Sequence, residues 1–208
     1  MTRIILVRHG QTEWNRVERF RGRANVPLDE TGLAQAEAVG QRIAAEWQPA
    51  AVYSSPLSRA IRTAEPIARP LNLTVRVHEG LVDIDYGQWQ GLTPDQVQER
   101  WPGIYHAWHS APHAAHIPGG ETLEELHVRG MAAICGLVAR HDGQTIVLVG
   151  HIVINRVILL GVLGLGIDRF WHLRQDTCAI SVFEAEGGDW TLVSLNDTCH
   201  WRSWNGPE

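Results

Sequence analysis

Short apolar runs alternate along the chain with longer segments in which apolar residues recur every three or four positions. Apolar runs of about four to eight residues are typical of buried strands, whereas the three-to-four spacing is typical of helices with one buried face. Their alternation predicts an α/β fold, in which helices pack on a central sheet.

The strongest strand signal is Ile4–Val7, which is fully apolar and rich in β-branched residues, as expected of a strand buried on both faces. Residues 145–149 have the same character. Further strands are predicted over residues 51–53, 73–77, 179–184 and 190–195, and the last two are joined by a hairpin signal at residues 186–189.

Three segments have helical spacing. In the first, Leu33, Ala36, Val39, Gly40 and Ile43 fall on one face. Two more helices are predicted over residues 57–68, with Pro70 stopping the helix, and over residues 122–140. Residues 84–122 are rich in loops, Trp, His and Pro, and we interpret this lid segment as an insertion over one end of the sheet.

Composition limits the partners of the chain. Of its 208 residues, 44% are apolar and 20% are charged, and the net charge of −5 without a basic stretch argues against nucleic acid. The longest apolar stretch, 157–165, is too short to span a membrane, and no signal peptide is evident. Three Cys without a C-x-x-C spacing indicate reduced thiols. We expect a cytoplasmic protein, monomeric or homodimeric.

Candidate chemistry gathers where strands end. The first strand leads into Arg8-His9-Gly10, the second into Ser54-Ser55-Pro56 and Arg59, and the strand at 145–149 into Gly150-His151. Ligands of α/β sheets bind at the carboxyl ends of strands, so we expect these residues to converge. Arg side chains bind phosphate oxygens in bidentate fashion, and a neutral imidazole between them can attack phosphorus.

Six ordered segments carry a resemblance to a known family. They are Arg8-His9-Gly10-Gln11-Thr12-Glu13-Trp14-Asn15, Pro27-Leu28 with Thr31-Gly32 and Gln35-Ala36, Ser54-Ser55-Pro56-Leu57-Ser58-Arg59-Ala60 with Thr63-Ala64, Gly87-x-Trp89-x-Gly91, Pro118-Gly119-Gly120-Glu121-Thr122, and Gly150-His151. Together they resemble the histidine phosphatase superfamily, in its phosphoglycerate-mutase-like branch. The resemblance extends from residue 3 to about residue 200.

The resemblance implies a three-layer α/β/α sandwich with a central, mostly parallel sheet, formed by a single domain over residues 1–208. It implies that His9 is the phosphorylated nucleophile and that Arg8, Arg59 and His151 bind the transferring phosphoryl group. It also implies substrate contacts, for which our candidates are Gln11, Thr12, Asn15, Arg21, Gly22, Glu121, Thr122 and Ile152. Glu121-Thr122 has a second interpretation, as a cap of the helix that follows. The resemblance calls for no cofactor and no metal.

The proton donor departs from the family pattern. The family usually has Glu four residues before the first Gly of G-x-W-x-G, and this chain has Asp83 there. Asp can protonate a leaving alkoxide, but its side chain is one methylene shorter, and proton transfer requires heavy atoms within about 2.6–3.2 Å. Asp85 is the competing candidate, because strand alternation places both on the same face. A second departure is Ile152-Val153-Ile154 after His151, which predicts a more apolar mouth.

The function predicted is hydrolysis of a small phosphomonoester. A 2,3-bisphosphoglycerate-dependent mutase is the alternative, but residues 92–117, where such mutases carry a basic segment, contain one Arg and no Lys. A non-catalytic phospho-ligand module is a further alternative, against which both His and both Arg argue. A metal-dependent hydrolase lacks a ligand set, because Pro112 and Pro118 interrupt the helical stripe of His106, His109, His113 and His116.

Overall fold

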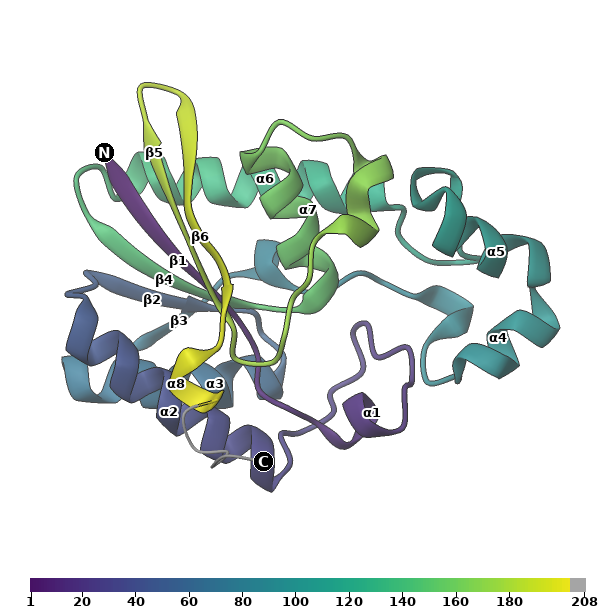
Figure 1. Ribbon diagram of the computed structural model, residues 1–208, viewed down its shortest axis with the longest axis horizontal. Coiled ribbons are helices and arrows are strands. Elements are labelled where there is room, and N and C mark those ends of the chain that lie inside the picture. Colours follow the sequence, from purple (N-terminus) through teal and green to yellow (C-terminus); the bar gives the residue numbers. More distant parts are fainter. Residues whose placement is uncertain (203–208) are drawn as a thin grey trace.

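A six-stranded sheet forms the centre of the protein in the computed structural model, which describes residues 1–202 (Figure 1). The strands are β1 (Thr2–Arg8), β2 (Ala51–Ser54), β3 (Val75–Val77), β4 (Thr145–Gly150), β5 (Ile180–Glu186) and β6 (Asp189–Asp197). Their order is β3-β2-β4-β1-β5-β6. The first four run parallel and the β5–β6 hairpin is antiparallel, which confirms the expectation of a mostly parallel sheet.

Helices cover both faces of the sheet (Figure 1). On one face lie α2 (Glu30–Glu46) and α3 (Ser58–Ala68), and on the other lie α6 (Leu123–Arg140) and α7 (Ile152–Val162). Residues of β1 divide between the two cores by strand alternation: Ile5 and Val7 pack towards α2 and α3, and Ile4 and Leu6 towards α6 and α7. The three-layer α/β/α sandwich is thereby confirmed.

The predicted elements differ from the structure in detail. Leu33 was expected on the buried face of the first helix, but it is 42% exposed, whereas Gln35 is buried. The buried face of α2 is centred on Ala36, Val39 and Ile43, and Leu33 lies at its margin. The strand expected at residues 73–77 begins at Val75, because Leu73 still belongs to the turn after α3.

The hairpin signal is confirmed. The β5–β6 turn consists of Gly187 and Gly188, with φ of +61° and +97°, a backbone conformation that side chains with a Cβ rarely adopt. The helix predicted over residues 122–140 is α6, and Thr122 is its N-cap in a capping box with Glu125.

The lid segment lies beyond the edge of the sheet, at the right of Figure 1, where α4 and α5 are far from the β-strands. Its elements are η3 (Gly87–Trp89), α4 (Pro94–Arg100), α5 (Pro102–Ser110) and η4 (Pro112–Ala114). Two elements that the sequence did not predict face it, namely α1 (Glu13–Arg16) and η5 (Ile167–His172). The remaining short elements are η1 (Arg69–Leu71), η2 (Glu79–Leu81) and α8 (Cys199–Arg202). The interpretation of residues 84–122 as a lid stays a prediction.

The described helices include none whose length and hydrophobicity would let it cross a membrane. Cys135, Cys178 and Cys199 are free thiols.

Candidate active site

The ends of β1, β2 and β4 meet at one edge of the sheet. Arg8 pairs with Gly150 in the parallel register of β1 and β4, and Ser54 pairs with Val149 in that of β2 and β4. The residues that follow are therefore neighbours, and the rings of His9 and His151 lie 5.0 Å apart between centroids. A Cβ on Gly10 would lie 2.6 Å from the carbonyl oxygen of Gly32, so only glycine allows this close approach to α2.

His9 is held as a neutral imidazole with one unprotonated nitrogen. Its Nδ1 lies 2.6 Å from the carbonyl oxygen of Gly10, which can only accept a hydrogen bond, so Nδ1 carries the proton. Burial, followed by the charge of Arg59, lowers the pKa of His9 well below its ordinary value. Nε2 therefore keeps its lone pair, and among the described residues it has no hydrogen-bond partner.

His151 is fixed by two hydrogen bonds. Arg59 Nε donates to Nδ1 over 3.1 Å, so the proton of the neutral ring is on Nε2, which donates to Ser55 Oγ over 2.7 Å. Burial and the charge of Arg59 also lower the pKa of His151 well below its ordinary value. The two imidazoles thus have opposite tautomers, and both are uncharged at neutral pH.

Arg59 connects the second histidine to the loop after α1. Its terminal nitrogens donate to the carbonyl oxygens of Ala24 and Gly22, over 2.6 and 2.7 Å. Gly22 has a φ of +48°, and a Cβ there would lie 2.8 Å from the carbonyl oxygen of Ile84. Only glycine fits this position without strain, so Gly22 brings the loop against both Arg59 and the lid segment.

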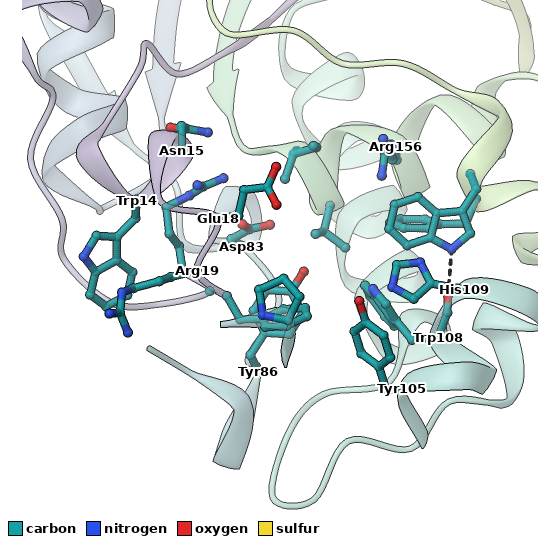
Figure 2. Close-up of a pocket in the computed structure, with 18 of the residues that line it drawn as sticks. Trp14, Asn15, Glu18, Arg19, Asp83, Tyr86, Tyr105, Trp108, His109 and Arg156 are labelled. Carbon is teal, nitrogen blue, oxygen red and sulfur yellow. Dashed lines mark hydrogen bonds between the residues drawn. The ribbon is translucent and has the colours of Figure 1, made fainter. Parts of the chain in front are cut away.

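A cavity of about 390 Å³ opens beside these residues (Figure 2). Of the predicted site residues, the cavity wall includes Arg8, Asn15, Arg21, Gly22, Asp83 and Ile152. His9, Arg59 and His151 are fully buried and lie outside the cavity wall. Contact between a phosphoryl group and His9 Nε2 therefore requires some movement of the side chains around it.

The cavity is rich in cations. Arg8, Arg19, Arg21 and Arg156 line it, against the carboxyl groups of Glu18 and Asp83. Burial and the charge of Arg21 lower the pKa of Arg8 to about 9, which still leaves it protonated at neutral pH. Arg8 donates to the carbonyl oxygen of Gln175, but its Nε has no partner in the described part of the chain. A buried cation of this kind favours an anionic ligand.

The two candidate proton donors have different surroundings. Asp83 is 2% exposed and lines the cavity, and burial raises the pKa of its carboxyl group, which favours the protonated form. The carboxylate of Asp85 turns away to accept a hydrogen bond from Gly87 N and to pair with Arg23 on the surface. The segment is not a strand, so the alternation expected to place both on one face does not apply.

Arg129, which the sequence did not indicate, holds the segment that carries Asp83. It donates to both carboxylate oxygens of Glu121, over 3.0 and 2.9 Å, and to the carbonyl oxygens of Gly80 and Val82, over 3.1 and 3.0 Å. The predicted substrate contact Glu121 thus takes part in a bidentate ion pair, which is joined by Arg23 over 3.3 Å.

Other predicted substrate contacts also make protein contacts. Gln11 donates to Asp29 over 3.0 Å, and Thr12 is buried and donates to Asn15 Oδ1 over 2.9 Å. Thr122 exchanges hydrogen bonds with Glu125 as a helix cap. None of Gln11, Thr12, Glu121 or Thr122 belongs to the cavity wall, so their contact with a substrate stays a prediction.

The described residues give no candidate metal site. Within residues 1–202, no cluster of three or more His, Cys, Asp or Glu side chains has the geometry to hold an ion. His106, His109, His113 and His116 of the lid segment are all exposed.

A family model and several named phosphatases are similar to this chain over nearly its whole length. The family model of the histidine phosphatase superfamily (branch 1) matches residues 4–198. Phosphoserine phosphatase 1 of Hydrogenobacter thermophilus is 35% identical over 200 residues, which cover 96% of this chain and 94% of that protein. A protein of Arabidopsis thaliana named metal-independent phosphoserine phosphatase is 37% identical over 205 residues, which cover 98% of this chain and 84% of that protein.

Solved structures share the fold over nearly the whole chain. YhfR of Bacillus stearothermophilus has a TM-score of 0.92 at 28% identity, over 96% of this chain and 99% of that chain. A mutant phosphoserine phosphatase of Entamoeba histolytica in complex with phosphoserine has a TM-score of 0.88 at 28% identity, over 97% of this chain and 100% of that chain.

Proposed function

The chain belongs to the histidine phosphatase superfamily (branch 1) and is a phosphomonoesterase, and we propose that it hydrolyses a small phosphorylated metabolite through a covalent phosphohistidine on His9. The observation that carries this proposal is the state of His9: a neutral ring whose unprotonated Nε2 has no partner within residues 1–202, next in sequence to Arg8, whose Nε has none there either. A phosphoryl group supplies what both atoms lack, an electrophile for one and an anion for the other.

In the first step, the lone pair of His9 Nε2 attacks phosphorus, and the bond between phosphorus and the ester oxygen breaks. Asp83, whose protonated form is favoured because burial raises the pKa of its carboxyl group, gives its proton to the leaving alkoxide. In the second step, water attacks the phosphohistidine, Asp83 takes a proton from that water, and the electron pair of the P–N bond returns to His9. The enzyme is thereby restored.

Arginines stabilise the charge that spreads over the equatorial oxygens of the transferring group. Arg8 and Arg21 line the cavity and supply charged donors to those oxygens. Arg59 contributes indirectly, because its hydrogen bonds orient His151 and hold the loop at Gly22. Because both histidines are uncharged, the guanidinium groups supply the positive charge that balances the anionic phosphoryl group.

We propose phosphoserine as the first substrate to test. Two of the relatives, at 35% and 37% identity, are named phosphoserine phosphatases, and a similar structure holds phosphoserine. A cavity of about 390 Å³ suits a ligand of this size.

The mutase remains a testable alternative. The lid segment places α4 and α5 over the cavity, with Tyr105, Trp108 and His109 in its wall. Residues 92–117 contain one Arg and no Lys, and so lack the basic segment that would hold a bisphosphate, and we expect water to be the acceptor rather than a second hydroxyl.

A screen of metabolite phosphates tests the proposal, with 2,3-bisphosphoglycerate-dependent mutase activity included and with each assay repeated in EDTA. We expect release of inorganic phosphate from phosphoserine and from p-nitrophenyl phosphate, at rates that EDTA does not change. Loss of activity in EDTA, or mutase turnover without phosphate release, would contradict it.

A further inference from the structure

Arg156 lines the same cavity as Arg8 and Arg21, the two arginines proposed to bind the phosphoryl group. It comes from the same face of α7 as Ile152 and Val153, since residues three or four apart on a helix are neighbours, and all three line the cavity. Figure 2 shows Arg156 on one side of the cavity with Trp108 and His109, and Asn15 on the other. Nothing in the proposed phosphoryl-transfer step uses this arginine.

The guanidinium group of Arg156 is fixed in place. Its Nε donates to the carbonyl oxygen of Leu173 over 2.8 Å, and its central carbon lies 5.0 Å from the ring centre of Phe170 and 4.9 Å from that of Trp171. Trp171 is itself held, because its Nε1 donates to the carbonyl oxygen of Trp108 over 2.7 Å and its ring stacks on that of His109. The cation is therefore oriented before any ligand arrives.

Arg156 also has no carboxylate in contact with it among the described residues. No carboxylate forms an ion pair with it in residues 1–202, and the carboxyl group of Asp83 acts on it through space rather than by contact. A guanidinium group has five N–H donors, and Leu173 takes one of them. The terminal nitrogens are a suitable site for the two oxygens of a carboxylate.

Charges in the cavity agree with a ligand that carries two anionic groups. Of the four arginines in the cavity wall, Arg19 is offset in charge by Glu18, and a dianionic phosphoryl group next to Arg8 and Arg21 neutralises those two, which leaves Arg156 without an anionic partner. Phosphate monoesters without a second anion leave this half-buried cation without an anionic partner, which is unfavourable.

We propose that Arg156 binds a carboxylate of the substrate while the phosphoryl group occupies the site of Arg8 and Arg21. Arg156 is thus a specificity-determining residue, and the substrate class is that of small phosphomonoesters that bear a carboxylate. This inference rests on the proposed phosphatase function.

The test compares phosphoserine with phosphoethanolamine, which has the same ester and ammonium group but no carboxylate. For each enzyme the measured quantity is the ratio of kcat/KM for the two esters. We expect wild type to favour phosphoserine and Arg156→Gln to reduce the ratio at least about 30-fold, mainly through KM, as for truncation of one partner of a buried charge pair. Arg156→Lys, which keeps the charge but not the planar fork, should give an intermediate ratio.

Arg169→Gln is the matched control, because Arg169 lies on η5 beside Phe170, outside the cavity wall, and is paired with Asp168. Its ratio should stay within about threefold of wild type. The inference is overturned if wild type has no preference for phosphoserine, or if Arg156→Gln and Arg156→Lys keep the wild-type ratio. Failure of the proposed function looks different: wild type then hydrolyses neither ester nor p-nitrophenyl phosphate.

Discussion

The two ends of the cavity are built in different ways. At the phosphate end, Arg8, His9 and His151 directly follow or end neighbouring parallel strands, and none is more than 6% exposed. At the opposite end, α5 and η5 form a wall of aromatic rings around Arg156, and Trp171 is 39% exposed. The sheet fixes the groups that we propose to perform the reaction, whereas side-chain packing between short helices positions the arginine that we propose to select the ester. Variants at the phosphate end should change the rate of the chemical steps, and variants around Arg156 should change the preference between esters.

The largest effect is expected from His9→Ala. Without a nucleophile, kcat for phosphoserine should fall at least about 10⁴-fold, in the range seen when a nucleophile is removed from a catalytic unit. Steady-state phosphate release measures the change. His106→Ala is the matched control, because that histidine is exposed on the lid segment. Turnover of His9→Ala within tenfold of wild type would rule out His9 as the nucleophile.

The substitution Asp83→Asn tests whether Asp83, rather than Asp85, is the proton donor. We expect kcat for phosphoserine to fall about 10²- to 10⁴-fold, because an alkoxide leaving group needs a proton. p-Nitrophenyl phosphate, whose leaving group needs little protonation, should be much less affected. Asp85→Asn is the control, since its carboxylate pairs with Arg23 at the surface. The assignment is wrong if Asp85→Asn shows this dependence on the leaving group and Asp83→Asn does not.

The pH dependence of the reaction should reveal the titration of Asp83. Because burial raises the pKa of Asp83, the protonated form is present below that pKa and is lost as pH rises through it. The rate on phosphoserine should fall up to tenfold per pH unit on this alkaline limb, and Asp83→Asn should lack the limb. His9 needs no deprotonation near pH 6.5, because burial lowers its pKa. An unchanged alkaline limb in Asp83→Asn would assign the titration to another group.

A smaller effect is expected from Arg129→Gln, which removes the pair with Glu121 and the hydrogen bonds to Gly80 and Val82. Asp83 should then be less well positioned, and kcat for phosphoserine should fall about tenfold, with a smaller loss on p-nitrophenyl phosphate. Arg140→Gln, at the far end of α6, is the control. Equal losses on both esters would indicate a structural role alone.

The smallest effect is expected at the aromatic wall. Trp171→Leu removes the ring on which Arg156 rests, and KM for phosphoserine should rise about threefold to tenfold, with less change in kcat, since a cation–π contact contributes about 0.5–2 kcal/mol. Initial rates over a range of phosphoserine concentrations separate the two constants. A fall in kcat with constant KM would place this wall in the chemistry and remove the contrast between the two ends.

Sequence patterns predicted the phosphate end better than the other. The convergence of Arg8-His9 with His151 follows from apolar strands and the geometry of parallel sheets, which are local features. Arg156 was not among the predicted site residues, because its place in the cavity depends on η5 folding back over α7. Arg129 was not indicated either, since its partner Gly80 is 49 residues away in sequence. The prediction that Leu33 lies on the buried face of α2 was wrong for a similar reason, because the exposure of Leu33 depends on what packs beside the helix.

The most direct test is to trap the phosphoenzyme. Wild-type protein mixed with phosphoserine, quenched within milliseconds in alkali and digested, should give one peptide with an acid-labile, base-stable phosphate on His9. Its rate of formation should match or exceed kcat. Turnover without such a species, or a phosphate located on another residue while His9 stays unmodified, would contradict the assignment of His9 as the nucleophile.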